Sequence, residues 1–141
     1  SSIDNVRILG PIRNYTQIEI SKTDAYKLGL NPPIRESGEI TGSEKITVVG
    51  PKGELNLDEG CIIATRHIHI NPKQVEMYGL TGKEYVDVLV GGEKQAILKD
   101  VFIKVSDPAY YEMHIDTDDA NANLIKNGDV ATILGIDDKN S

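Results

Sequence analysis

Short segments rich in β-branched residues recur along the chain, separated by turns that contain glycine or proline. Several of them alternate apolar and polar positions, as strands with one buried face do. The pattern predicts strands at residues 6–9, 16–20, 46–49, 54–57, 61–64, 85–90, 95–98, 101–105 and 130–134. Pro51-Lys52-Gly53 and Gly91-Gly92 lie between predicted strands, so we expect antiparallel hairpins there. The sequence therefore predicts a mainly β fold, and the hairpins favour a barrel over a doubly wound sheet.

Three short helices are expected between these strands, at residues 22–28, 72–78 and 117–125. The second is the best marked, because Asn71 is a typical N-cap, Pro72 suits the first helical position and Gly79 follows the end. Each helix has about two turns. The helices are therefore minor elements beside the strands.

A weak internal repeat joins three places where a strand enters a helix. Ile18-Glu19-Ile20-Ser21 precedes the first helix and Ile68-His69-Ile70-Asn71 precedes the second. Met113-His114-Ile115-Asp116 has the same form before the third. Because side chains alternate along a strand, we expect the apolar residues to face a core and the polar residue between them to face the other way. The repeat therefore gives Glu19, His69 and His114 equivalent positions.

All three histidines of the protein belong to this pattern, since His67 lies two residues before His69 on the same face of one strand. A His-x-His pair with a third, distant histidine is a usual way to hold zinc or a similar divalent ion through imidazole. The alternative is that the histidines are surface or hydrogen-bonding residues. Glu19 taken alone is a solvated strand residue.

Other residues that could bind a substrate or react also have simple structural explanations. Arg13 and Arg66 carry guanidinium groups that suit phosphate, although a surface ion pair explains either of them as well. Cys61 lies in an apolar strand, which favours a buried structural thiol over a nucleophile. Tyr110 and Tyr111 are expected to pack or to line a pocket. The chain contains no nucleotide-binding glycine motif.

Composition narrows the class of partner. The formal net charge of −7 and the absence of tryptophan disfavour nucleic acid. A single cysteine excludes an internal disulfide framework and suits a reducing cytoplasm. The sequence lacks a signal peptide and an apolar run of membrane-spanning length, so we expect no membrane association. Small molecules are the expected partners.

Several motifs resemble one known family, the PduL-type phosphate acyltransferases, or phosphate propanoyltransferases, and the resemblance spans nearly the whole chain. The matching stretches are Leu9-Gly10-Pro11-Ile12-Arg13, Thr16-Gln17-Ile18-Glu19-Ile20-Ser21, Val49-Gly50-Pro51-Lys52-Gly53, Ala64-Thr65-Arg66-His67-Ile68-His69-Ile70 and Glu112-Met113-His114-Ile115-Asp116-Thr117-Asp118. The resemblance implies two linked small β-barrels capped by short helices and a site for two metal ions, usually zinc. It also implies exchange of a propanoyl or acetyl group between coenzyme A and inorganic phosphate, giving an acyl phosphate.

Carried over residue by residue, the resemblance makes His67, His69 and His114 the ligands of one ion and Glu19 a ligand of the second. It makes Arg13 the catalytic, phosphate-binding residue. It further implies a cytoplasmic enzyme of propanediol degradation or acetate metabolism, in some cases inside a bacterial microcompartment, and a homo-oligomer is compatible with it.

The chain departs from the family pattern at its start, because family members carry a further N-terminal segment with another His-x-His pair. We therefore expect residues 1–141 to be the family region truncated at its N-terminus, with its two barrel lobes interleaved. One zinc ion is expected here, and activity is expected to be weak. Three hypotheses stay open: a metal-dependent phosphate acyltransferase, a metal-binding but non-catalytic fragment, and a β-barrel interaction module with incidental histidines.

Overall fold

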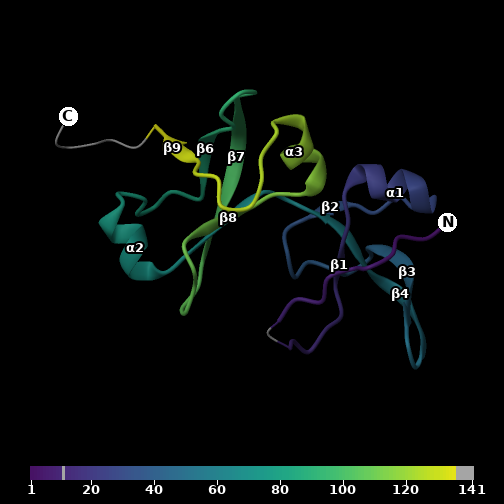
Figure 1. The fold of residues 1–141 in the computed structure, drawn as a ribbon. Coiled ribbons are helices and arrows are strands. Elements are labelled where there is room, and N and C mark those ends of the chain that lie inside the picture. Colours follow the sequence, from purple (N-terminus) through teal and green to yellow (C-terminus); the bar gives the residue numbers. More distant parts are fainter. Residues whose placement is uncertain (11, 136–141) are drawn as a thin grey trace. The chain divides into compact units, whose positions relative to one another are not determined.

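The chain folds mainly into strands, with short helices between them (Figure 1). A computed structural model describes residues 1–10 and 12–135. The elements are β1 (Ile18–Glu19), α1 (Lys22–Leu28), β2 (Ile34–Arg35), β3 (Glu44–Gly50), β4 (Gly53–Ala64), β5 (His67–Ile70), α2 (Pro72–Met77), β6 (Tyr85–Val90), β7 (Ala96–Val105), β8 (Glu112–His114), α3 (Thr117–Ala122) and β9 (Thr132–Leu134). The mainly β fold with short helices that the sequence predicts is confirmed. No helix in the described part of the chain has the length and apolar character needed to cross a bilayer.

The chain divides into two compact units, Ser1–Ala64 and Thr65–Ser141. In the first unit the long strand β4 lies at the centre: β1 and β2 pair with it in parallel and β3 pairs with it antiparallel. In the second unit the strand order is β8-β5-β7-β6-β9. Strands β5 and β7 are parallel, and the other neighbouring pairs are antiparallel.

One face of the second sheet carries the hydrophobic core of its unit. Ile68 and Ile70 of β5 are buried there as part of one core cluster, and Met113 of β8 and Ile115, which follows β8, pack against that cluster. The other buried residues of this cluster are Leu80, Val86, Val88, Val90, Leu98, Val101 and Ile103. The core therefore occupies the face that the alternation of β5 assigns to its isoleucines, which leaves the opposite face for its histidines.

Both predicted hairpins are confirmed, at β3–β4 and β6–β7. Two predicted strand pairs are instead single strands, because a bulge and not a turn interrupts each. Residues 54–57 and 61–64 belong to β4, whose register against β3 shifts between Glu44 and Ile46. Residues 96–98 and 101–105 belong to β7, which begins one residue later than predicted and has a register shift opposite Val86 and Val88. The third helix is also shorter than predicted.

The strand predicted at residues 6–9 is wrong. These residues form no strand, and the side chains of Val6, Ile8 and Leu9 are 63%, 95% and 70% exposed. Apolar, β-branched composition suits a pleated surface but does not supply the neighbouring backbone that a strand needs. The two-residue strand β2 was not predicted, since so short a segment carries no periodicity.

The internal repeat is present in the structure as three copies of one local motif. Ser21, Asn71 and Asp116 each cap a helix by accepting a hydrogen bond from the backbone N–H three residues later. Each helix closes with the same backbone bond, in which Leu30, Leu80 and Ile125 donate to the carbonyls of Ala25, Val75 and Ala120. The cap and the closing bond fix the direction in which the chain leaves Glu19, His69 and His114.

The third copy departs from the repeat at one position. Gly29 and Gly79 end the first two copies with φ of 70°, and Leu124 takes the same place with φ of 54°. The left-handed region costs a residue with a Cβ about 1–2 kcal/mol. Leu124 is 58% exposed, so its side chain contributes little packing.

We therefore expect Leu124→Gly to raise the free energy of unfolding by roughly 0.5–1 kcal/mol, because the relieved strain exceeds the entropy that glycine adds to the unfolded chain. Urea unfolding measures this change. The matched control is Gly29→Ala, where no atom lies within 4 Å of the added Cβ, and it should lower stability by about 1 kcal/mol. A destabilised Leu124→Gly protein would contradict this interpretation.

Candidate metal centre

The three histidines meet on two adjacent strands of the second sheet. His67 and His69 project from the same face of β5, and His114 lies directly opposite His67 on the antiparallel strand β8. The ring centroids are 4.7 Å apart for His67 and His69, 5.1 Å for His67 and His114, and 4.4 Å for His69 and His114. The predicted juxtaposition of these residues is thus confirmed.

The cluster has the dimensions of a site for one metal ion. One ring nitrogen from each histidine can be chosen so that all three lie within 4.8 Å of one another. The Nε2 atoms of His67 and His69 are 3.0 Å apart. Two nitrogens on one tetrahedral zinc ion lie roughly 3.3 Å apart, given Zn–N bonds of about 2.0–2.1 Å. Small movements would therefore bring these two nitrogens to ligand positions.

Neighbouring oxygens determine which ring nitrogens carry protons. His67 Nδ1 lies 2.9 Å from the carbonyl oxygen of Thr65, which can only accept, so Nδ1 carries the proton and Nε2 has a lone pair. When the His67 ring is neutral, His69 Nε2 donates to His67 Nε2. Metal binding through both Nε2 atoms requires that the His69 proton leave or move to Nδ1. The Thr65 carbonyl is thus an outer partner of the kind that orients metal-binding histidines.

The third histidine has a carboxylate partner. His114 Nε2 lies 2.9 Å from Glu112 Oε1. An ionised carboxylate accepts and does not donate, so Nε2 carries a proton, and in the neutral ring the lone pair is on Nδ1. We did not predict a role for Glu112 from the sequence as an individual residue. The sequence does contain a signal for Glu112, because it lies two residues before His114 and residues two apart on a strand share a face.

The electrostatic surroundings keep His69 neutral. Burial, followed by the proximity of His114 and then His67, lowers the pKa of His69 to about 4. At neutral pH this imidazole is uncharged, which is the form that binds metal. Lys104 lies beside His69 in the register of β7 and lowers the same pKa further, whereas Glu112 raises it.

The metal-free protein should lose stability as the pH falls from about 6.5 to about 4. His69 has an ordinary pKa of 6.5 when unfolded and about 4 when folded, so over this interval the unfolded chain binds more protons and protonation favours unfolding. Urea unfolding at the two ends of the interval measures the loss. His69→Gln should reduce it, and an identical pH dependence in that variant would show that another group is responsible.

The other predicted site residues lie in the first unit. Glu19 is exposed on β1 and accepts a hydrogen bond from Gln17 at 2.8 Å. Arg13 is exposed and precedes β1. Their predicted roles, a second metal ligand and a phosphate-binding residue, stay predictions.

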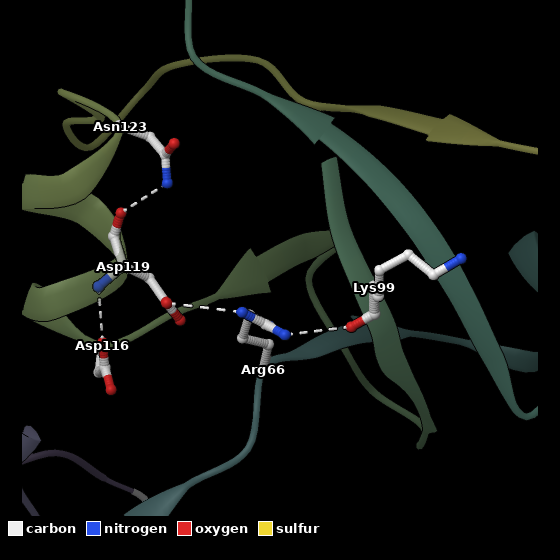
Figure 2. A network of polar contacts seen from close by, with 5 residues as sticks. All are labelled: Arg66, Lys99, Asp116, Asp119 and Asn123. Carbon is white, nitrogen blue, oxygen red and sulfur yellow. Dashed lines mark hydrogen bonds and ion pairs between the residues drawn. The ribbon is translucent and has the colours of Figure 1, made fainter. Parts of the chain in front are cut away.

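The plainer interpretations are confirmed for several residues. Arg66 forms an ion pair with Asp119 at 3.5 Å and donates to the Lys99 carbonyl at 3.1 Å (Figure 2). Cys61 is buried, and burial is the main cause that raises the pKa of its thiol to about 11, so the reactive thiolate is scarce at neutral pH. Tyr111 stacks on Tyr78 with ring centroids 4.9 Å apart.

The donor set fits a borderline-soft divalent ion. Three imidazoles suit zinc, copper, iron or nickel, whereas calcium and magnesium prefer oxygen ligands. Three protein ligands also leave a coordination position for water or substrate, which is typical of catalytic and not structural zinc sites. The histidines of β5 and β8 can therefore hold one metal ion and leave one of its coordination positions open.

Comparison with known proteins places the chain in a family. The sequence model of the phosphate propanoyltransferases matches residues 1–126. Proteins named phosphate propanoyltransferase are 47% identical over 134 residues in Thermotoga maritima, 53% over 133 in Lachnoclostridium phytofermentans and 52% over 132 in Priestia megaterium. Each alignment covers 94% of this chain and respectively 64%, 62% and 61% of the relative. The chain thus spans about three fifths of the length of these relatives, and it belongs to the phosphate propanoyltransferase family.

Proposed function

We propose that the protein transfers a propanoyl or similarly short acyl group between coenzyme A and inorganic phosphate, and that it needs a divalent metal ion, most suitably zinc. Membership in the phosphate propanoyltransferase family supports the reaction class. The observation that carries the metal requirement is the convergence of His67, His69 and His114 on β5 and β8.

The reaction imposes a clear electrostatic demand. A phosphate oxygen bonds to the carbonyl carbon of the thioester, the carbon–sulfur bond breaks, and coenzyme A leaves as the thiolate or, after taking up a proton, as the thiol. Both nucleophile and leaving group are anionic, so the protein must bring two anions together and stabilise negative charge on the carbonyl oxygen. A metal ion held by the three histidines would supply Lewis-acid polarisation and charge neutralisation at that oxygen.

The residues of this chain have separate tasks in this proposal. The Thr65 carbonyl and the Glu112 carboxylate hold the His67 and His114 rings in one orientation each. Glu19 would contribute a carboxylate ligand to a second ion, and Arg13 would bind and orient phosphate through its guanidinium fork. Cys61 takes no part as a nucleophile, because it is buried and its pKa is raised to about 11. Direct attack by phosphate needs no covalent enzyme intermediate.

The test is an assay of acyl transfer from propanoyl-CoA to phosphate, followed by release of coenzyme A. We expect activity to fall on treatment with a chelator and to return when zinc is added. Full activity in protein shown by elemental analysis to be free of metal would contradict the metal requirement. Metal binding without acyl transfer would favour the non-catalytic alternative.

The role of Arg13 gives a second, separable expectation. Arg13→Lys keeps the positive charge but loses the two parallel donors, so it should raise the KM for phosphate several-fold and more than the KM for propanoyl-CoA. Initial-rate kinetics with each substrate varied in turn measure both constants. Arg35→Lys is the matched control, since Arg35 donates to the carbonyls of Glu39 and Thr41 within its own unit. Equal effects on the two substrates would assign Arg13 a merely structural role.

A further inference from the structure

Arg66 links three segments of the second unit through both its main chain and its side chain. Its guanidinium lies between the Asp119 carboxylate, at 3.5 Å, and the Lys99 carbonyl oxygen, at 3.1 Å (Figure 2). Its own carbonyl accepts a hydrogen bond from the Phe102 N–H at 3.1 Å. Arg66 is therefore attached to β7 twice and to α3 once.

These attachments lie next to the metal-binding histidines along the chain. Arg66 directly precedes His67, the first residue of β5. Asp119 lies in the first turn of α3, the helix that begins just after His114 and is capped by Asp116. The two ligand strands are far apart in sequence, and β8 pairs with β5 through three residue pairs. A further link between the start of β5 and the start of α3 would limit how far His67 and His114 can move apart.

The ion pair is partly shielded from solvent. The Arg66 and Asp119 side chains are 33% and 27% exposed, and the Asp119 carbonyl also accepts a hydrogen bond from Asn123. Burial and then Asp116 raise the pKa of the Asp119 carboxyl above its ordinary value, and Arg66 only partly opposes this rise. Both terminal guanidinium nitrogens already have oxygen partners, so this arginine differs from one left free to bind phosphate.

We propose that Arg66 is a positioning residue for the metal centre, which fixes the spacing of His67 and His114 by tying the start of β5 to α3 and β7. This inference rests on the proposed metal-dependent function, since it requires that the three histidines bind an ion. It gives Arg66 a role distinct from that of Arg13.

The test is a double-mutant cycle read out as metal affinity. Arg66→Gln, Asp119→Asn and the double variant are titrated with Co²⁺, whose visible absorption reports the geometry of nitrogen ligands. Measurements are made well below the unfolding temperature of every variant. We expect each single variant to bind Co²⁺ about 5- to 10-fold more weakly, which is less than the roughly 10- to 100-fold effects of residues that contact a ligand directly, because Arg66 and Asp119 act through the backbone. The double variant should bind no more weakly than the single variants, because the shared link is already lost.

Lys99→Gln is the matched control. It breaks the 2.9 Å ion pair of Lys99 with Asp87 but leaves the Lys99 carbonyl in place, so Co²⁺ affinity and absorption should match those of the unaltered protein. Should Arg66→Gln fail to fold, Arg66→Lys retains the charge and is expected to show a smaller loss of affinity. Unchanged affinity in the Arg66 and Asp119 variants, or additive losses in the double variant, would overturn the inference. Failure of the unaltered protein to bind Co²⁺ would instead refute the metal site itself.

Discussion

His69→Ala should weaken metal binding by at least about 10-fold. The substitution removes one of three imidazoles, which is a larger change than loss of an outer partner, for which 10- to 100-fold effects are usual. The remaining nitrogens, from His67 and His114, belong to rings whose centroids are 5.1 Å apart on neighbouring strands. With only two protein ligands, water molecules would occupy the remaining coordination positions of the ion. Competition with a chromophoric chelator measures the dissociation constant.

Glu93→Ala is the control for this variant, since it removes an exposed carboxylate at the β6–β7 hairpin of the same unit. Its affinity for zinc should equal that of the unaltered protein. If His69→Ala and Glu93→Ala bound zinc equally well, the ion would reside elsewhere and the histidine cluster would be a hydrogen-bonding feature of the sheet.

Ile70→Ala should lower the free energy of unfolding by about 3–4 kcal/mol. Ile70 is fully buried, belongs to the core cluster of the second unit and lies between His69 and the N-cap Asn71. Large-to-small substitutions at such positions cost about 2–5 kcal/mol, through lost burial and the cavity that remains. This loss is a substantial part of the 5–15 kcal/mol that is usual for a whole domain. Urea or thermal unfolding of the metal-free protein measures it.

Ile97→Ala makes the same chemical change on β7, where the side chain is 53% exposed. We expect it to cost less than about 1 kcal/mol. Similar losses for the two variants would contradict the assignment of the core to the face that carries Ile68 and Ile70.

The repeat allowed much of the second unit to be predicted from the sequence. Two signals reinforced each other there: the alternation that separates Ile68 and Ile70 from His69, and the capping residue that follows. Since both are local, they specify which face a side chain takes without knowledge of the partner strand. That local information was enough to place His69 and His114 in equivalent positions.

Features that depend on distant backbone could not be predicted in this way. The bulges in β4 and β7 exist because the partner strand has fewer residues opposite, which is a property of the pair and not of either segment. β5 and β7 pair in parallel and are not joined by a hairpin, so no turn sequence indicates that they are neighbours. The contact of Arg66 with Asp119 joins residues far apart in sequence. Residues 6–9 have the composition of a strand but pair with no other strand, so the local pattern predicts an element there that the structure lacks.

The most direct test of the central claim is X-ray absorption spectroscopy of the protein loaded with one equivalent of zinc. We expect a first shell that includes three imidazole nitrogens at about 2.0–2.1 Å, with a fourth ligand from water or phosphate. In His69→Ala the imidazole contribution should fall to two or the ion should be lost. A first shell of oxygen atoms alone, or a spectrum that His69→Ala leaves unchanged, would contradict the assignment of His67, His69 and His114 as the metal ligands.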